Sequence, residues 1–261
     1  MTQIARPIFH AVQELAVGSL FCLALLPSGL VRRGFFQTCV LILAVAVGLG
    51  VWVSPTAPST ILLVALLLYG GSLWMSDARW PRLLLLLSLA LGTLGMFAPS
   101  FMSIGFIGGS ALPSVAIAQI LNTLASALLL GSTLIGMLLG HYYLRDPQLP
   151  VALIRRLADL FLLATVMQGL LLVVNLGALY LFGGAEAVAM ISLLSTSYGA
   201  IFLGRLFVGI LGSFVLGCVI WDTLRIPNVQ AATGFFYMAI LTVAIGEFLG
   251  RYLWHSTSIP F

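Results

Sequence analysis

Long apolar runs separated by short polar loops recur along the whole chain, and they restrict the fold more than any other feature. Of the 261 residues, 61% are hydrophobic and 7% are charged, and there is no lysine. A run of about twenty apolar residues is long enough to cross the hydrocarbon core of a bilayer as a helix. The sequence therefore predicts an all-α integral membrane protein and excludes a water-soluble one.

Apolar runs bounded by Pro, Gly or charged residues predict about eight transmembrane helices in one polytopic membrane domain. The predicted helices are 9–30, 36–54, 59–76, 82–99, 114–141, 158–182, 198–222 and 229–253. An outer loop at 99–113 divides them into two groups of four, 1–98 and 114–254, which are followed by a short tail at 255–261. The run 187–221 is too long for one span and too short for two, so we expect it to begin as an extension in the outer leaflet or outside the membrane.

The arginines predict the orientation of these helices. All eight arginines between the predicted spans fall in alternate loops, which must share one side of the membrane. Loops rich in Lys and Arg face the cytoplasm, so we expect this side to be cytoplasmic and both termini to lie outside. The expected location is the inner (cytoplasmic) membrane of the cell. In a membrane protein, a surplus of arginines over acids reflects the orientation of the helices. We therefore do not expect nucleic acid as a partner. The eight arginines are Arg32, Arg33, Arg79, Arg82, Arg145, Arg155, Arg156 and Arg225.

Apart from the charges at the loops, three ionisable residues lie clearly within predicted spans, namely Glu14, Arg205 and Glu247, and Arg251 lies one turn beyond Glu247. A charge at the bilayer centre costs about 2.5–3.5 kcal/mol on insertion scales, so such residues usually face a partner or a wet cavity. At the helical rise of 1.5 Å per residue, Glu14, Arg205 and Glu247 lie roughly 8–10 Å below the outer boundary of their spans. Their common depth predicts that they meet, with Arg251 one turn beyond Glu247.

Uncharged polar residues also lie toward the outer ends of the predicted spans. Gln119 and Asn122 lie in the outer turns of the fifth predicted helix, and Tyr198 begins the seventh. His10 precedes Glu14 by four residues and shares its helix face. The sequence therefore predicts a polar pocket that opens toward the outer face.

A purely structural interpretation also exists for each of these residues. Arg251 could extend to the interface near the negative end of its helix, and Glu247 could serve only as its i,i+4 partner. Arg205 has no partner on its own helix, which leaves either a structural salt bridge between helices or a ligand-binding role. His10 could be a surface histidine.

Neither a metal site nor a haem site is predicted. Cys22, Cys39 and Cys218 stand alone, without the spacing of a metal or redox motif. Haem b in a helical bundle needs axial ligands on facing helices. The chain has three histidines, and none lies deep within a predicted span. His10 and His255 share the outer side, but one lies at a helix entrance and the other in the tail.

Small residues four apart predict close helix contacts on three helices. The pairs are Gly136 with Gly140, Ala200 with Gly204, and Gly246 with Gly250.

The last predicted helix carries a family resemblance. The stretch "FFYMAILTVAIGEFLGRYLW" resembles the final helix of the membrane anchor subunits of dimethyl-sulfoxide-reductase type, which group with the polysulfide-reductase and NrfD-like subunits. The matching residues are Gly246, Glu247, Gly250 and Arg251. "FHAVQELAVGSLFCLALL" and "GRLFVGILG" are loosely similar, while the close match covers about 25 residues. The resemblance implies eight spans with both termini outside, a quinol bound near the outer face, and electron transfer to an iron–sulfur partner by a subunit without metal.

We therefore predict a quinone-interacting membrane anchor subunit of a respiratory oxidoreductase complex, which contacts lipid, quinone, and iron–sulfur and catalytic subunits. Such a subunit is non-catalytic or oxidises quinol within its complex, and is not a stand-alone enzyme. Quinol oxidation releases protons, so Glu14 or Glu247 would act as proton acceptor. The predicted head-group ligands are His10, Gln119, Asn122, Arg205 and Arg251. Two other functions stay open. A small-solute transporter would have broken helices and inverted repeats, and a structural subunit would use its charges for assembly.

Overall fold

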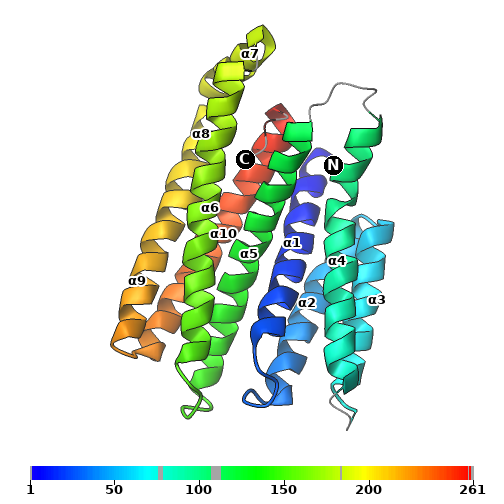
Figure 1. The fold of residues 1–261 in the computed structure, drawn as a ribbon, viewed down its shortest axis with the longest axis vertical. Helices are drawn as coiled ribbons and strands as arrows, with labels where there is room; N and C mark the ends of the chain where they lie inside the picture. Colours follow the sequence, from blue (N-terminus) through cyan, green and yellow to red (C-terminus); the bar gives the residue numbers. More distant parts are fainter. Residues whose placement is uncertain (1, 76–78, 107–112, 183, 258, 260–261) are drawn as a thin grey trace.

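The computed structural model describes residues 2–75, 79–106, 113–182, 184–257 and 259, and the regular structure of these residues is helical throughout (Figure 1). The elements are α1 (Thr2–Leu25), α2 (Arg33–Val53), α3 (Ala57–Ser72), α4 (Arg79–Phe106), α5 (Pro113–Tyr143), α6 (Ala152–Phe182), α7 (Gly184–Thr196), α8 (Gly199–Gly204), the π-helix η1 (Arg205–Gly212), α9 (Ser213–Arg225) and α10 (Val229–Thr257).

Seven of the helical stretches in the described part of the chain are long and apolar enough to cross a membrane, which confirms a multi-pass helical membrane protein. The third predicted span, 59–76, corresponds to α3, an apolar helix of 16 residues that is shorter than the other seven. It begins at a capping box between Thr56 and Ser59, with Pro58 in its first turn. Of the eight predicted spans, seven therefore correspond to long apolar helices and the third to this short apolar helix.

Two predicted boundaries differ from the structure. Helix α4 continues to Phe106, so the first half of the predicted loop 99–113 is helical, while residues 107–112 lie outside the described residues. The composition around Pro99 predicted a loop, but a membrane helix tolerates proline when neighbouring groups satisfy the freed backbone. The run 187–221 divides into α7 and the span Gly199–Arg225. Helix α7 lies at the end of the bundle (Figure 1), so the run begins in a separate helix, while its place in the outer leaflet or outside the membrane stays a prediction.

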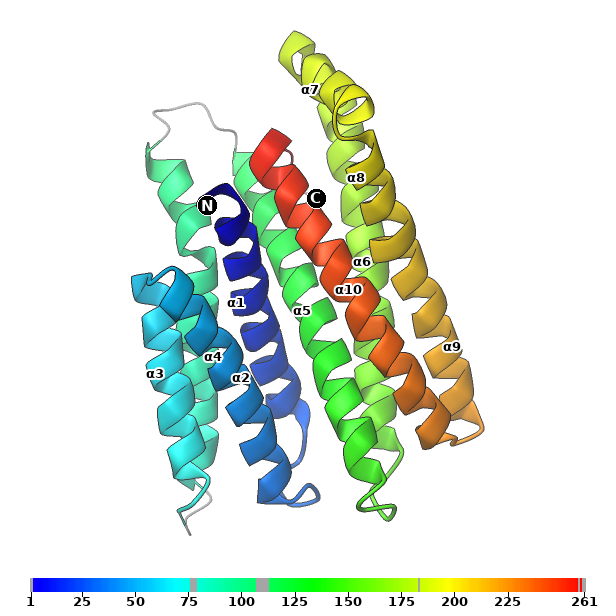
Figure 2. The same cartoon turned by 180° about the vertical axis from the view of Figure 1, so that it is seen from behind.

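The turns between helices distinguish the two ends of the bundle. The turns after α1, α3, α5 and α9 lie at one end, and the labels of both chain termini lie toward the other (Figures 1 and 2). The eight arginines that predict orientation lie in these turns or in the adjoining ends of the helices. We name this the arginine end, and the opposite end the terminal end. The assignment of the arginine end to the cytoplasm stays a prediction.

Helix α5 is the centre of the bundle. It packs against α1, α6 and α10, and 78% of its most apolar stretch is buried, against 22% for α4. An ideal Cβ on Gly131 would lie 2.1 Å from the carbonyl carbon of Gly18, so α1 and α5 touch backbone to backbone. This contact joins the two predicted groups of four helices. Apolar side chains such as Leu41, Trp52 and Leu170 remain exposed on the outside of the bundle, as a lipid-facing surface requires.

Candidate functional site

Glu14 of α1 pairs with Arg251 of α10 inside the bundle. The Nε of Arg251 donates to Oε2 of Glu14 at 3.2 Å, and its Nη2 donates to Oε1 of the same carboxylate. Nη2 of Arg251 also lies 3.4 Å from the hydroxyl of Thr123 on α5. The side chains of Glu14 and Arg251 are 2% and 6% exposed, so this two-point contact is removed from solvent. The pair ties the first helix to the last.

A second ion pair lies one turn away on α10. The Nη1 of Arg205 donates to Oε1 of Glu247 at 2.9 Å, and its Nη2 donates to the side-chain carbonyl of Gln168 on α6. The amide nitrogen of Gln168 then donates to the hydroxyl of Ser126 on α5 at 2.8 Å. Arg205 and Glu247 are both 1% exposed. We name the four charged residues with Thr123, Ser126 and Gln168 the buried polar network.

Glycines and a π-helix make room for the Arg205 side chain. Arg205 begins η1, and π-helical turns are rare and concentrate at functional sites. Where η1 crosses α10, an ideal Cβ on Gly246 would lie 2.3 Å from Cα of Gly209. An ideal Cβ on Gly250 would lie 3.0 Å from Nε of Arg205. The two backbones therefore approach closely, and the guanidinium occupies the space beside Gly250.

Further polar residues stack above the network, toward the terminal end. Side chains four apart share a helix face. By this spacing Gln119 lies one turn from Thr123, and Asn122 lies one turn from Ser126. Asn122 is 2% exposed, and its Nδ2 has no hydrogen-bond partner among the described residues, whereas Gln119 is half-buried. A buried amide donor without a protein partner is unusual, since most such groups are satisfied.

An aromatic and histidine cluster forms the rim of the network. The His10 ring lies 6.3 Å from the ring of Trp254 and 5.8 Å from that of His255, between centroids. Trp254 in turn lies 5.6 Å from the guanidinium carbon of Arg251. His10 is half-buried and His255 is exposed. The cluster therefore leads from the protein surface to the Glu14–Arg251 pair.

The structure decides several of the alternatives that the sequence leaves open. The predicted approach of Glu14, Arg205, Glu247 and Arg251 is confirmed, because each belongs to an ion pair between different elements. Two structural interpretations are wrong. Arg251 does not extend to the interface, since it is 5% exposed, and Glu247 pairs with Arg205 rather than with its i,i+4 neighbour. The predicted pocket is also not open at its charged residues, which lie enclosed between the helices.

Gln168, Ser126 and Thr123 belong to the network but were missed in the sequence. Ser and Thr are common in membrane helices, where they often bond to their own backbone, so their presence alone does not mark a site. Gln168 carried a usable signal, because a glutamine is costly to place in lipid without a partner. It lies ten residues into the predicted span 158–182, far from both of its ends.

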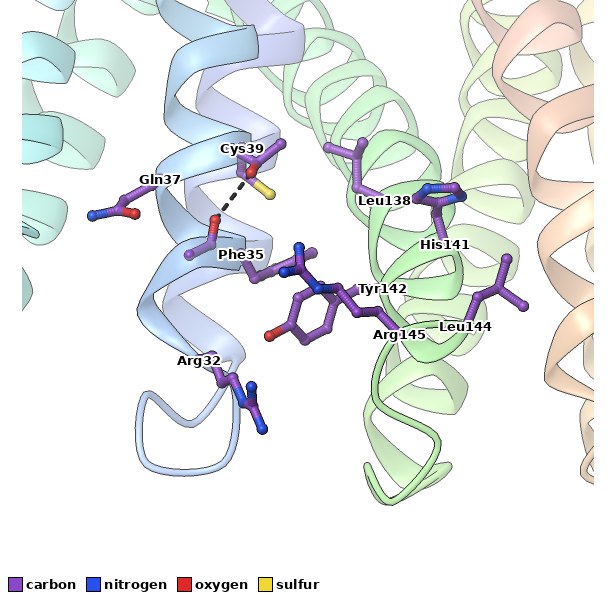
Figure 3. A pocket seen from close by; sticks show the side chains of 11 residues that line it. Arg32, Phe35, Gln37, Cys39, Leu138, His141, Tyr142, Leu144 and Arg145 are labelled. Atoms are coloured by element: carbon purple, nitrogen blue, oxygen red, sulfur yellow. Dashed lines mark hydrogen bonds between the residues drawn. The ribbon is translucent and has the colours of Figure 1, made fainter.

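Two polar cavities lie at the arginine end, away from the buried polar network. The larger, of about 780 Å³, lies between α2 and α5 (Figure 3). Tyr142 in the last turn of α5 and Arg145 in the turn after it reach toward α2, and the ring of Tyr142 lies 5.4 Å from that of Phe35. Arg32 lies near the turn before α2, with its Nε 3.7 Å from the carboxylate of Asp146. Neither cavity was predicted from the sequence.

No cluster of three or more His, Cys, Asp or Glu side chains that could hold a metal ion occurs among the described residues. Comparison with known protein families, curated proteins and solved structures finds no significant match for this chain. The class defined by the fold and the network is therefore a helical, multi-pass membrane protein with two buried ion pairs, and its function is a matter for proposal.

Proposed function

We propose that the protein is a quinol-interacting membrane anchor subunit, and that its quinol head group binds beside the buried polar network. The observation that carries this proposal is the unpartnered Nδ2 of Asn122, which is buried one helical turn from Ser126 of the buried polar network. A quinone ring needs a few directed hydrogen bonds within apolar walls. Asn122 supplies a donor for a ring oxygen, and the neighbouring apolar side chains of α1, α5 and α10 supply the walls.

The chemistry follows from the two carboxylates. Oxidation of a quinol breaks two O–H bonds and releases two protons and two electrons. Glu14 or Glu247 accepts the two protons in turn, and the paired arginine compensates the carboxylate charge before each proton is taken up and again once it has left. The rim cluster of His10, Trp254 and His255 connects Glu14 with the surface and gives the proton an exit. The electrons pass to an iron–sulfur partner subunit, as in the anchor family that the last helix resembles.

A purely structural subunit is the second candidate, and one observation favours it. The two arginines and two glutamates of the network neutralise each other in the interior, so no charge remains for a ligand. In this alternative the network fixes the positions of α1, α10 and η1 for assembly with other subunits.

The proposal is tested by variants that keep the packing and remove the chemistry. In membranes that carry the complete complex, Asn122→Leu is expected to lower quinol-analogue oxidation at least tenfold, because it loses the head-group donor at nearly constant volume. The double variant Arg205→Gln/Glu247→Gln keeps a neutral hydrogen-bonded pair and is also expected to lose activity. Ser132→Ala is the matched control, since the Ser132 hydroxyl bonds only to its own helix, at Leu129.

Quinone content in solvent extracts of the purified protein provides the second measurement. It should fall in Asn122→Leu and stay constant in Ser132→Ala. Normal oxidation and normal quinone content in both Asn122→Leu and the neutral double variant would contradict the proposal and leave the structural subunit.

A further inference from the structure

The second cavity at the arginine end, of about 460 Å³, gathers three arginines from three helices. It lies between the last turn of α1, the turn that follows it, and the adjoining ends of α2, α3, α4 and α6. Arg33 is the first residue of α2, while Arg82 and Arg156 lie in the first two turns of α4 and α6. We name this the three-arginine cavity.

The described residues that line this cavity carry positive charge and no negative charge. No carboxylate occurs among the described residues that line it, and the nearest acid on α6, Asp159, is exposed one turn beyond Arg156. Nη1 of Arg33 donates to the backbone carbonyl of Met75 at 2.5 Å, which fixes one guanidinium at the wall. The amino ends of α2, α4 and α6 also point to this end of the bundle and add partial positive charge.

Apart from Ser28 and Tyr69, the rest of the wall is apolar, and the combination of arginines with apolar side chains indicates the kind of ligand. Leucines of α1 and the buried side chains of Phe36, Leu73 and Leu85 form the apolar part of the lining. Apolar side chains do not contribute to the binding of a free inorganic anion, whereas a phospholipid has both a phosphate for the arginines and acyl chains for the apolar wall. Basic pockets between helix ends are a known type of site for anionic lipid head groups.

We propose that the three-arginine cavity binds one anionic phospholipid, with its phosphate between Arg82 and Arg156 and an acyl chain along Phe36 and Leu85. The larger cavity is a weaker candidate because Asp146 lies 3.7 Å from Arg32 and offsets its charge. This site is independent of the proposed quinol site, since none of the residues of the buried polar network lines it.

The test is native mass spectrometry of the full-length protein in neutral detergent with added lipid. Phosphatidylglycerol and phosphatidylcholine with identical acyl chains are compared, since their head groups differ in net charge. The wild-type protein should retain one phosphatidylglycerol at least tenfold better than phosphatidylcholine, and Arg82→Gln/Arg156→Gln should abolish most of that preference. Arg225→Gln is the matched control, because Arg225 is exposed at the same end and lies 3.9 Å from Asp222.

Each other outcome overturns the proposal. Equal retention of the two lipids, or unchanged preference in the double variant, would show that the cavity does not select an anionic head group. Displacement of the lipid by millimolar inorganic phosphate would assign the site to the free anion. Should the double variant not fold, Arg156→Gln alone, at an exposed side chain, must still weaken retention, and Arg156→Lys must restore part of it.

Discussion

At the scale of single residues, the buried polar network contains two ion pairs. In each pair, the buried charge of one side chain requires the opposite charge of its partner. Removing one partner of a buried pair leaves an uncompensated charge, which is far more destabilising than removing both. Glu247 is the only carboxylate partner of Arg205 among the described residues. The cost of each single substitution therefore reports how well the interior excludes water.

We expect Arg205→Ala to destabilise the protein by about 3–5 kcal/mol, because Glu247 would stay buried without its partner. The neutral double variant Arg205→Gln/Glu247→Gln should lose clearly less. Denaturant unfolding in a fixed detergent, followed by helical circular dichroism, measures both. Equal losses in the single and double variants would mean that water reaches Glu247 and that the pair is not sealed.

The histidines lead to a separate expectation. His10 and His255 lie at the rim, in contact with each other and with Trp254, and the third histidine, His141, lies at the other end of α5. We expect the purified protein to contain no haem b. A visible-region absorption spectrum of the dithionite-reduced protein checks this, and a haem band that disappears in His10→Ala would contradict it.

At the scale of helices, the sequence predicts which residues meet but not how. The common depth of Glu14, Arg205 and Glu247 predicts their contact. The partners of each charge depend on the rotation of every helix about its axis, which hydropathy leaves undefined when a helix is apolar all round. For this reason Gln168 and the close contact of Gly18 with Gly131 were missed. The glycine pair Gly246 and Gly250 was recognised, but its partner Gly209 was not.

Glycine substitutions on α10 test the contact between α10 and η1. Gly246→Ala should destabilise the protein by about 1–3 kcal/mol, because its Cβ would overlap Cα of Gly209 and force the backbones apart. Gly234→Ala on the same helix is the control, since no heavy atom lies within 4 Å of its ideal Cβ. It should be neutral or slightly stabilising, as alanine favours helix. Thermal unfolding of the two variants in the same detergent gives the comparison, and equal midpoints would mean that the helices separate without cost.

At the scale of the whole molecule, the two ends of the bundle have different chemistry. The arginine end has short turns and two basic cavities, while the terminal end has the histidine and tryptophan rim above the buried polar network. The proposed quinol site and the proposed lipid site therefore face opposite membrane surfaces. Side-chain burial cannot decide which surface is which, because a bilayer presents the same apolar core to both. The arginine bias of the sequence alone assigns the sides.

Reporter fusions in intact cells decide that assignment. Loops rich in arginine are retained in the cytoplasm. A reporter placed after residue 148, in the turn between α5 and α6, should therefore report a cytoplasmic location. The same result is expected after residue 226, between α9 and α10. A reporter after the last residue, Phe261, should read external. An external signal at 148 with a cytoplasmic signal at the C-terminus would invert the protein. In that case the proposed quinol site would release its protons toward the cytoplasm, and the proposed quinol oxidation would not move charge outward.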